Sequence, residues 1–139
     1  RPAAVCHDGR SRERPTNVEI AEAFGLSTTL ARTRVDVAVI GAGPAGLGAA
    51  VYAASEGLDA LVVEREAIGG QAGSSSLIRN YLGFARGIPG ADLAMRAYQQ
   101  AWVFGASFLL MREVIALTPD GARLALALSG GDEARARAV

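Results

Sequence analysis

Three glycines and one acid, at positions 41, 43, 46 and 64, are the residues whose types and spacing could do chemistry. In the segment DVAVIGAGPAG, Gly41 permits a tight turn, Gly43 lets the backbone approach a phosphate, and Gly46 lets a helix pack against a strand. Glu64 follows at roughly the 20-residue distance at which an acid meets the ribose hydroxyls of a bound dinucleotide. The pattern therefore predicts a dinucleotide-binding site, and the alternative is an ordinary strand–turn–helix corner without a ligand.

The elements around these residues must aim them at the ligand. The continuous apolar run at 37–40 predicts a parallel strand that is covered on both faces. Pro44 suits the first turn of the following helix, whose free N–H groups and dipole favour an anion. Gly57 is expected to end this helix, and residues 59–64 then form a second strand that closes a βαβ unit.

Composition excludes several classes of function. The chain has 139 residues with 14 basic and 14 acidic groups, so its charge predicts no nucleic-acid partner. No apolar run approaches the roughly 18 residues of a membrane span, so no membrane partner is expected. Cys6 is the only cysteine, which fits a reducing compartment and predicts a cytoplasmic protein. Cys6 and His7 are adjacent but lack further partners, and we predict no metal site.

The first 34 residues differ in character from the rest. Residues 1–16 are polar and basic, and they indicate a linker or the tail of a preceding domain. Asn17 is expected to cap a short helix that runs through Phe24 and ends at Gly25. The chain opens on Arg1 with no signal-like segment, so we expect it to be a piece of a longer protein.

A glycine- and serine-rich stretch, IGGQAGSSSLIRNYLGFARG, occupies residues 68–87. Its small residues would let a flat ring or a phosphate chain lie against the backbone. The alternative is a flexible surface loop, which is usual for such a composition. The segment from Ile78 to Phe84 mixes aromatic side chains with a polar amide and favours an ordered loop.

Four features together resemble a known family: GAGPAG, the acid Glu64, AIGGQAG and RNYLGF. In combination they look like the low-molecular-weight thioredoxin reductases and their close relatives among the FAD-dependent pyridine nucleotide-disulfide oxidoreductases. The resemblance covers residues 35–139 and implies an α/β fold. It implies a Rossmann-like FAD-binding domain with a parallel sheet and an added β-hairpin or meander, incomplete relative to the family. The glycine motif would then hold FAD, and NADPH would bind a second domain that these residues do not contain.

The resemblance also implies roles for individual residues. Those that would line the FAD pyrophosphate are Gly41, Gly43, Pro44, Ala45 and Gly46. Glu64 would bind the adenosine ribose, and Arg65 beside it is a further expected cofactor-binding residue.

The remaining implied contacts come from later in the chain. Gly70 and Gln71 would meet the ribityl and ring side of FAD, and Asn80 would lie beside the isoalloxazine. Val114 matches a position whose backbone meets the adenine. Residues 1–34 are then a linker or tail with one short helix, and residues 35–139 are a partial FAD-binding domain.

The sequence pattern predicts the remaining elements. Pro89 and Gly90 open a helix over 91–104, with Leu93, Ala97, Ala101 and Phe104 on its apolar face and with Tyr98 and Trp102 as core or boundary residues. A parallel strand is expected over 107–111. A hairpin over 113–118 and 123–128 would turn at Pro119-Asp120-Gly121. A last strand over 133–139 is expected at an edge of the sheet.

Three functions are compatible with these motifs and with the family resemblance. The leading one is the FAD-binding part of an NADPH-dependent disulfide reductase, homodimeric by resemblance, whose partner is thioredoxin-like. The second is a relative without a CxxC pair that passes electrons to ferredoxin or another acceptor. The third is a non-catalytic nucleotide-binding fragment. No residue here is a convincing acid, base or nucleophile, so we expect the chain alone to be inactive and to supply a flavin scaffold.

Overall fold

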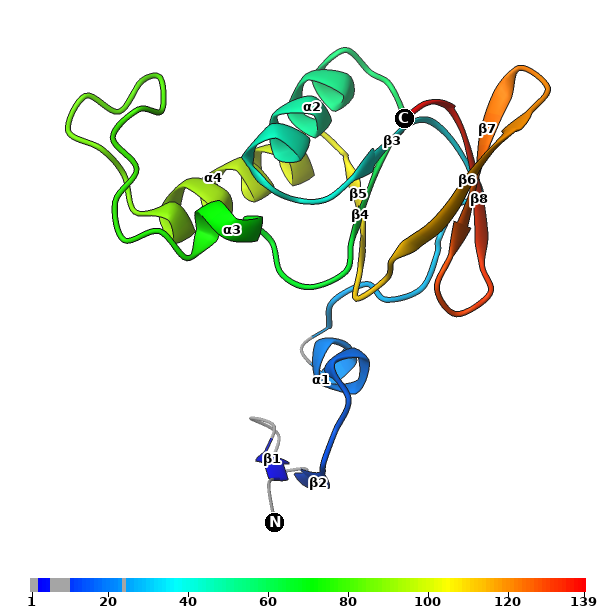
Figure 1. Ribbon diagram of the computed structural model, residues 1–139, viewed down its shortest axis with the longest axis horizontal. Coiled ribbons are helices and arrows are strands. Elements are labelled where there is room, and N and C mark those ends of the chain that lie inside the picture. Colours follow the sequence, from blue (N-terminus) through cyan, green and yellow to red (C-terminus); the bar gives the residue numbers. More distant parts are fainter. Residues whose placement is uncertain (1–2, 6–10, 24) are drawn as a thin grey trace.

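A six-stranded sheet forms the centre of the molecule (Figure 1). The computed structural model describes residues 3–5, 11–23 and 25–139. The six strands are β3 (Arg34–Ile40), β4 (Ala60–Glu64), β5 (Ser107–Leu110), β6 (Val114–Asp120), β7 (Arg123–Leu128) and β8 (Glu133–Ala138). Their order is β5-β4-β3-β8-β7-β6. The first four strands run parallel to one another, β7 is antiparallel to β8, and β6 is antiparallel to β7. This confirms the predicted α/β fold with a parallel sheet and an added meander.

The βαβ unit consists of β3, α2 (Pro44–Ser55) and β4, as predicted. Val37 pairs with Ala60 in parallel register. Helix α2 ends at Ser55, and Gly57 follows its C-cap: the N–H of Gly57 bonds the carbonyl of Ala54 at 3.0 Å, and its positive φ of 78° turns the chain away from the helix. The chain can then turn directly into β4, which carries Glu64 to the edge where the glycine corner lies.

Two helices cover one face of the parallel strands, α2 and α4 (Gly90–Val103) (Figure 1). Buried side chains of β3, β4 and β5 form one core with these helices. The ring of Tyr98 packs edge-on against that of Phe108, with 4.7 Å between the ring centroids. On the other face, Leu61 and Leu109 join Leu126 and Leu128 of β7 in a second core. Strands β7 and β8 therefore contribute to the core on this face, whereas β6 is mostly exposed.

The prediction of the apolar face of α4 is partly wrong at the C-terminal end of the helix. The helix stops at Val103, so Phe104 lies beyond it and is half exposed. Tyr98 is packed against the core, but Trp102 is 66% exposed and is not a core residue. A four-residue helix that the sequence did not predict, α3 (Gly70–Gly73), precedes α4 and packs against it.

Strand β8 was expected at an edge but lies inside the sheet, between β3 and β7. Its alanines at 134 and 136 are fully buried, which lets neighbouring elements pack closely. Arg135 pairs with Asp120 at 2.6 Å and Arg137 pairs with Asp36 at 3.2 Å. A strand with this many charges can lie inside the sheet because its arginines find acidic partners, Asp36 on the neighbouring strand β3 and Asp120 on β6, one strand further away.

The edge strands of the sheet are β5 and β6, and the turn after β6 differs from the prediction. Strands β6 and β7 stay paired as far as Asp120 and Arg123, so the turn is Gly121-Ala122. Pro119 is therefore a strand residue, which is tolerated because an edge strand does not need every N–H. Gly121 has a φ of 62°, which suits a two-residue hairpin turn.

The N-terminal part holds β1 (Ala3–Val5), paired antiparallel with β2 (Ser11–Glu13), and helix α1 (Asn17–Ala23). The linker interpretation did not anticipate these two strands. Thr16 rather than Asn17 caps α1: its hydroxyl accepts from the N–H of Glu19 at 3.2 Å, and the Glu19 carboxylate accepts from the N–H of Thr16 at 2.8 Å. This reciprocal pair follows from the spacing Thr-x-x-Glu, which the sequence contains.

The structure can be searched for a metal site and for a membrane-spanning helix only within the described residues. Among them, no group of three or more His, Cys, Asp or Glu side chains could hold a metal ion, and no helix is long and apolar enough to cross a membrane. Cys6, His7 and Phe24 lie outside the described residues.

Candidate cofactor-binding site

The glycine corner between β3 and α2 is open where a phosphate would approach. A Cβ built on Gly41 or Gly43 meets no atom within 4 Å, so the fold itself does not require glycine there for space. Gly41 has a φ of 95°, which favours glycine, whereas Gly43 has ordinary extended angles of −73° and 176°. Gly43 therefore carries no conformational or packing demand from the chain itself.

Gly46 behaves differently from the other two glycines. A Cβ there would collide with the carbonyl of Gly41 and come within 3.1 Å of the Val39 side chain. Gly46 is thus required for the close contact of α2 with β3, as the sequence predicted.

The N-terminus of α2 faces this open corner. Its N-cap residue, Gly43, has no side chain that could bond the free N–H groups of the first turn, and Pro44 occupies the first helical position. The N–H groups of Ala45 and Gly46 belong to that turn. The positive end of the helix dipole adds a favourable field for an anion.

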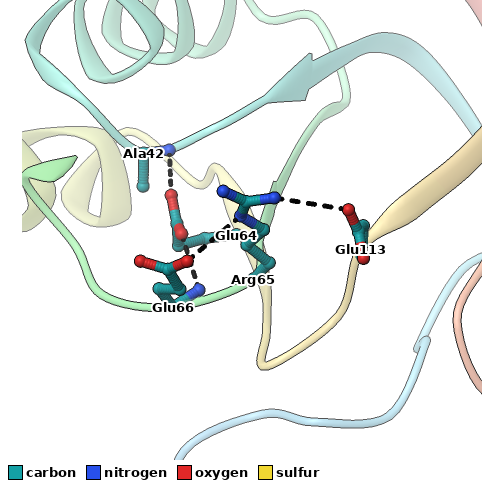
Figure 2. A network of polar contacts seen from close by, with 5 residues as sticks. All are labelled: Ala42, Glu64, Arg65, Glu66 and Glu113. Carbon is teal, nitrogen blue, oxygen red and sulfur yellow. Dashed lines mark hydrogen bonds and ion pairs between the residues drawn. The ribbon is translucent and has the colours of Figure 1, made fainter.

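Glu64 lies at the end of β4 beside the corner and is only 8% exposed. Its carboxylate accepts hydrogen bonds from the N–H groups of Ala42 and Glu66, each at 2.7 Å (Figure 2). The two bonds use different oxygens, and each oxygen retains a second lone pair. The acid is therefore held in place and can still accept from a hydroxyl.

A cavity of about 240 Å³ opens between the ends of β3, β4 and the start of β6. It is lined by Ile40, Gly41, Val63, Glu64, Arg65, Arg112, Glu113 and Val114. Four predicted site residues, Gly41, Glu64, Arg65 and Val114, thus come together from three separate stretches of the chain.

Arg65 extends across this cavity to the segment after β5. It pairs with Glu113 at 3.4 Å and with its neighbour Glu66 at 3.3 Å (Figure 2). All three side chains are mostly exposed, so these pairs orient Arg65 more than they stabilise the fold.

Arg112 and Glu113 line the cavity but were not among the predicted site residues. The signal was present, since both follow the third parallel strand, and the carboxyl ends of parallel strands meet at one edge of the sheet.

Gly70 lies against the glycine corner. The N–H of Gly69 bonds the carbonyl of Ala42 at 2.7 Å, and a Cβ on Gly70 would sit 3.6 Å from the Cα of Gly43. The backbone of α3 is therefore next to the phosphate corner. Gln71 is exposed on the same short helix.

Asn80 lies on the loop that follows α3. It is exposed on the segment between Ile78 and Ile88, which are joined by a bridge, and this segment projects beyond α3 and α4 (Figure 1). It does not line the 240 Å³ cavity.

Comparison with known proteins gives the family. The family model described as pyridine nucleotide-disulphide oxidoreductase matches residues 35–138. The chain belongs to this family. It is 40% identical over 106 residues to a thioredoxin reductase of Bacillus subtilis, covering 75% of this chain and 32% of that protein.

Solved members of the same family superpose on the chain. A thioredoxin reductase from Streptococcus pyogenes matches 76% of this chain and 33% of its own, with a TM-score of 0.70 and 30% identity. A ferredoxin-flavin thioredoxin reductase from Clostridium acetobutylicum matches 75% of this chain and 35% of its own, with a TM-score of 0.63 and 29% identity. The chain thus spans about a third of the length of the relatives it matches.

The matched third corresponds to the FAD-binding portion of thioredoxin reductase-like members of this oxidoreductase family, which confirms the predicted resemblance. The residues present fit such a cofactor. The corner has room that a Cβ at Gly43 would fill, the α2 N-terminus has no side-chain cap, and a positioned acid stands beside both.

Proposed function

We propose that this chain binds FAD at the glycine corner and serves an NADPH-dependent flavoprotein that reduces a disulfide in a thioredoxin-like partner. One observation supports the binding site above the others: the space in front of Gly43 is open at an uncapped helix N-terminus, although nothing in the fold requires it to be open. A pyrophosphate would use that space. The thioredoxin-like partner is inferred from the relatives named thioredoxin reductase.

The proposal assigns each residue a binding task. Gly41, Gly43, Pro44, Ala45 and Gly46 would surround the pyrophosphate. Glu64 would accept from the adenosine ribose hydroxyls, with Arg65 beside it and the backbone of Val114 at the adenine. Gly70 and Gln71 would extend the contact toward the ribityl chain.

Asn80, on the loop that follows α3, would lie beside the isoalloxazine, the end of FAD that the ribityl chain separates from the pyrophosphate. FAD supplies the hydride and electron transfer, and this chain supplies position and electrostatics. NADPH would bind outside these residues. We infer a homodimer in the cytoplasm for the whole protein.

The test compares two glycine substitutions in the same helix region. Gly43→Ala should weaken FAD binding tenfold or more, about 1.4 kcal/mol, because the methyl group enters the phosphate space. Gly48→Ala is the matched control, since its Cβ also meets no atom within 4 Å but points away from the turn by its place in α2. Flavin absorbance and fluorescence titration measure the binding. Equal FAD affinity in the two variants would contradict the site.

A second candidate concerns the electron source. The structural match to a ferredoxin-flavin thioredoxin reductase favours a relative in which ferredoxin replaces NADPH. Anaerobic mixing of the full-length flavoprotein with NADPH or with reduced ferredoxin distinguishes the two. Bleaching of the visible flavin absorption band by NADPH supports the first, and bleaching by reduced ferredoxin alone supports the second.

A further inference from the structure

Residues 25–33, here called the connector, run from α1 to β3 alongside the edge strand β5. The N–H of Leu110 in β5 donates to the carbonyl of Ser27 at 2.9 Å. Thr28 is only 2% exposed, and its hydroxyl donates to the carboxylate of Glu22 at 2.8 Å. At the far end of the connector, the carbonyl of Thr33 accepts from the N–H of Arg135 at 2.8 Å. The connector is therefore docked on the sheet.

This docking depends on a few polar contacts. A cavity of about 540 Å³ separates much of the connector from β5 and the end of α4, and it is lined by side chains such as Leu30, Trp102 and Phe108. Segments held by few buried apolar contacts open at low free-energy cost. The attachment therefore consists of the bonds made at Ser27 and Thr28, the ion pair of Arg32 with Asp59 at 2.9 Å, and the packing of Leu30 against the second core.

Arg112 makes one of these bonds and extends it to the meander. Its Nε donates to the carbonyl of Thr28 at 3.0 Å, and its terminal NH1 donates to the carbonyl of Ser129 at 3.2 Å. Gly130, with a φ of 92°, leaves the space for this guanidinium, because a Cβ there would collide with it. The planar fork of arginine suits two such acceptors, and lysine cannot reproduce it.

Arg112 also forms part of the wall of the 240 Å³ cavity. Its N–H donates to the carbonyl of Glu64 at 3.2 Å, directly behind the acid expected to hold the ribose. The next residue, Glu113, accepts at its side chain from Arg65 and donates its N–H to the Ser129 hydroxyl at 2.9 Å. Arg112 thus touches the connector, the meander and the cavity wall at once.

We propose that Arg112 couples docking of the connector to FAD binding at the adenosine end of the site. The coupling rests on the proposed FAD-binding function. When the connector is docked, the guanidinium is fixed and the cavity wall is ordered before the nucleotide arrives. By linkage, a nucleotide that orders this wall strengthens docking by the same factor. A force or partner acting on the chain before residue 25 would then change flavin affinity without touching the flavin.

The experiment measures both sides of the coupling in the full chain. FAD affinity is measured by fluorescence titration, and amide hydrogen exchange of the peptide covering 25–33 is followed by mass spectrometry with and without FAD. In the wild type, FAD should slow exchange in the connector. Arg112→Ala should weaken FAD binding about fivefold or more, the lower end of typical coupling, and connector exchange should no longer respond to FAD. Arg112→Lys should fall between the two.

Arg123→Ala is the matched control. Arg123 also donates to a backbone carbonyl, that of Val35 at 3.0 Å, but it does not line the 240 Å³ cavity. It should leave FAD affinity and the FAD response of the connector unchanged.

The outcomes separate the two proposals. If the wild type binds FAD but Arg112→Ala binds it equally well, or if the connector does not respond to FAD, the coupling is wrong while the binding site stands. If the wild type binds no FAD, both proposals are wrong. Faster connector exchange in Arg112→Ala with unchanged FAD affinity would reduce Arg112 to a structural role and overturn the coupling.

Discussion

At the scale of single residues, Glu64 shows how an acid can be ready for a ligand before the ligand binds. Two backbone N–H groups hold its carboxylate at 2.7 Å each, so its position is fixed within the fold. Binding would then cost little side-chain entropy, which is the usual benefit of preorganisation. The same bonds make the acid part of the structure of the corner, so its replacement should affect both stability and binding.

Glu64→Gln tests this double role. The amide NH₂ would face one of the two N–H donors, so one hydrogen bond is lost and a donor is left unpaired. We expect the free energy of unfolding to fall by about 1–3 kcal/mol and FAD affinity to fall about tenfold, or about 1.4 kcal/mol. Urea unfolding and FAD titration measure the two effects. Glu66→Gln, on an exposed side chain outside the cavity, should change neither by a comparable amount.

At the scale of elements, the sequence predicted those whose pattern is local. The apolar run before the glycine corner and the end of α2 before Gly57 depend on neighbours in the chain, and the structure confirms them. The placement of β8 depends on which strands lie beside it. Its charges suggested an edge, but Asp120 and Asp36, which pair with Arg135 and Arg137, are distant in sequence.

The candidate site divides in the same way. The glycines and Glu64 were predicted from their characteristic spacing along the chain. Arg112 was not predicted because its side chain bonds backbone carbonyls, so no partner residue marks it in the sequence, and only its position after β5 pointed to this edge of the sheet.

Gly46→Ala tests the packing of α2 on β3. The added methyl group would strike the Gly41 carbonyl, and both elements are rigid there, so the helix must shift. We expect a loss of about 1–3 kcal/mol in unfolding free energy, as is typical of overpacking. Chemical denaturation measures it, with Gly48→Ala as the control that should be neutral or up to about 1 kcal/mol more stable. A Gly46→Ala protein as stable as the wild type would show that α2 does not need this contact.

At the scale of the whole molecule, Asp36 links three strands at one end of the sheet. Its carboxylate accepts from the N–H of Asp59 at the start of β4 at 3.0 Å and pairs with Arg137 of β8 at 3.2 Å. The Asp59 N–H, followed by the Arg137 guanidinium, holds the pKa of Asp36 below its usual value of 3.8. The group therefore favours the folded state when it is ionised.

Asp36→Asn should reveal this contribution as a function of pH. Because the folded pKa is lowered, the stabilisation is fully present above the unfolded pKa near 3.8 and is lost as pH falls through the folded pKa. The wild type should exceed the variant in unfolding free energy at about pH 6, and the difference should disappear at the acid end of the titration. Asp132→Asn, in the exposed turn before β8, controls for the loss of one charge. A difference that stayed constant with pH would contradict the assigned cause.

The two outer strands of the sheet are protected by different means. On β6, Pro119 offers no N–H to an incoming chain, although Ile115 and Leu117 are exposed there. On β5, the connector occupies part of the outer side through the bond between Ser27 and Leu110. A protein that lost its first 30 residues would uncover the outer side of β5, and the unpaired backbone groups there would become available for pairing with a strand of another molecule.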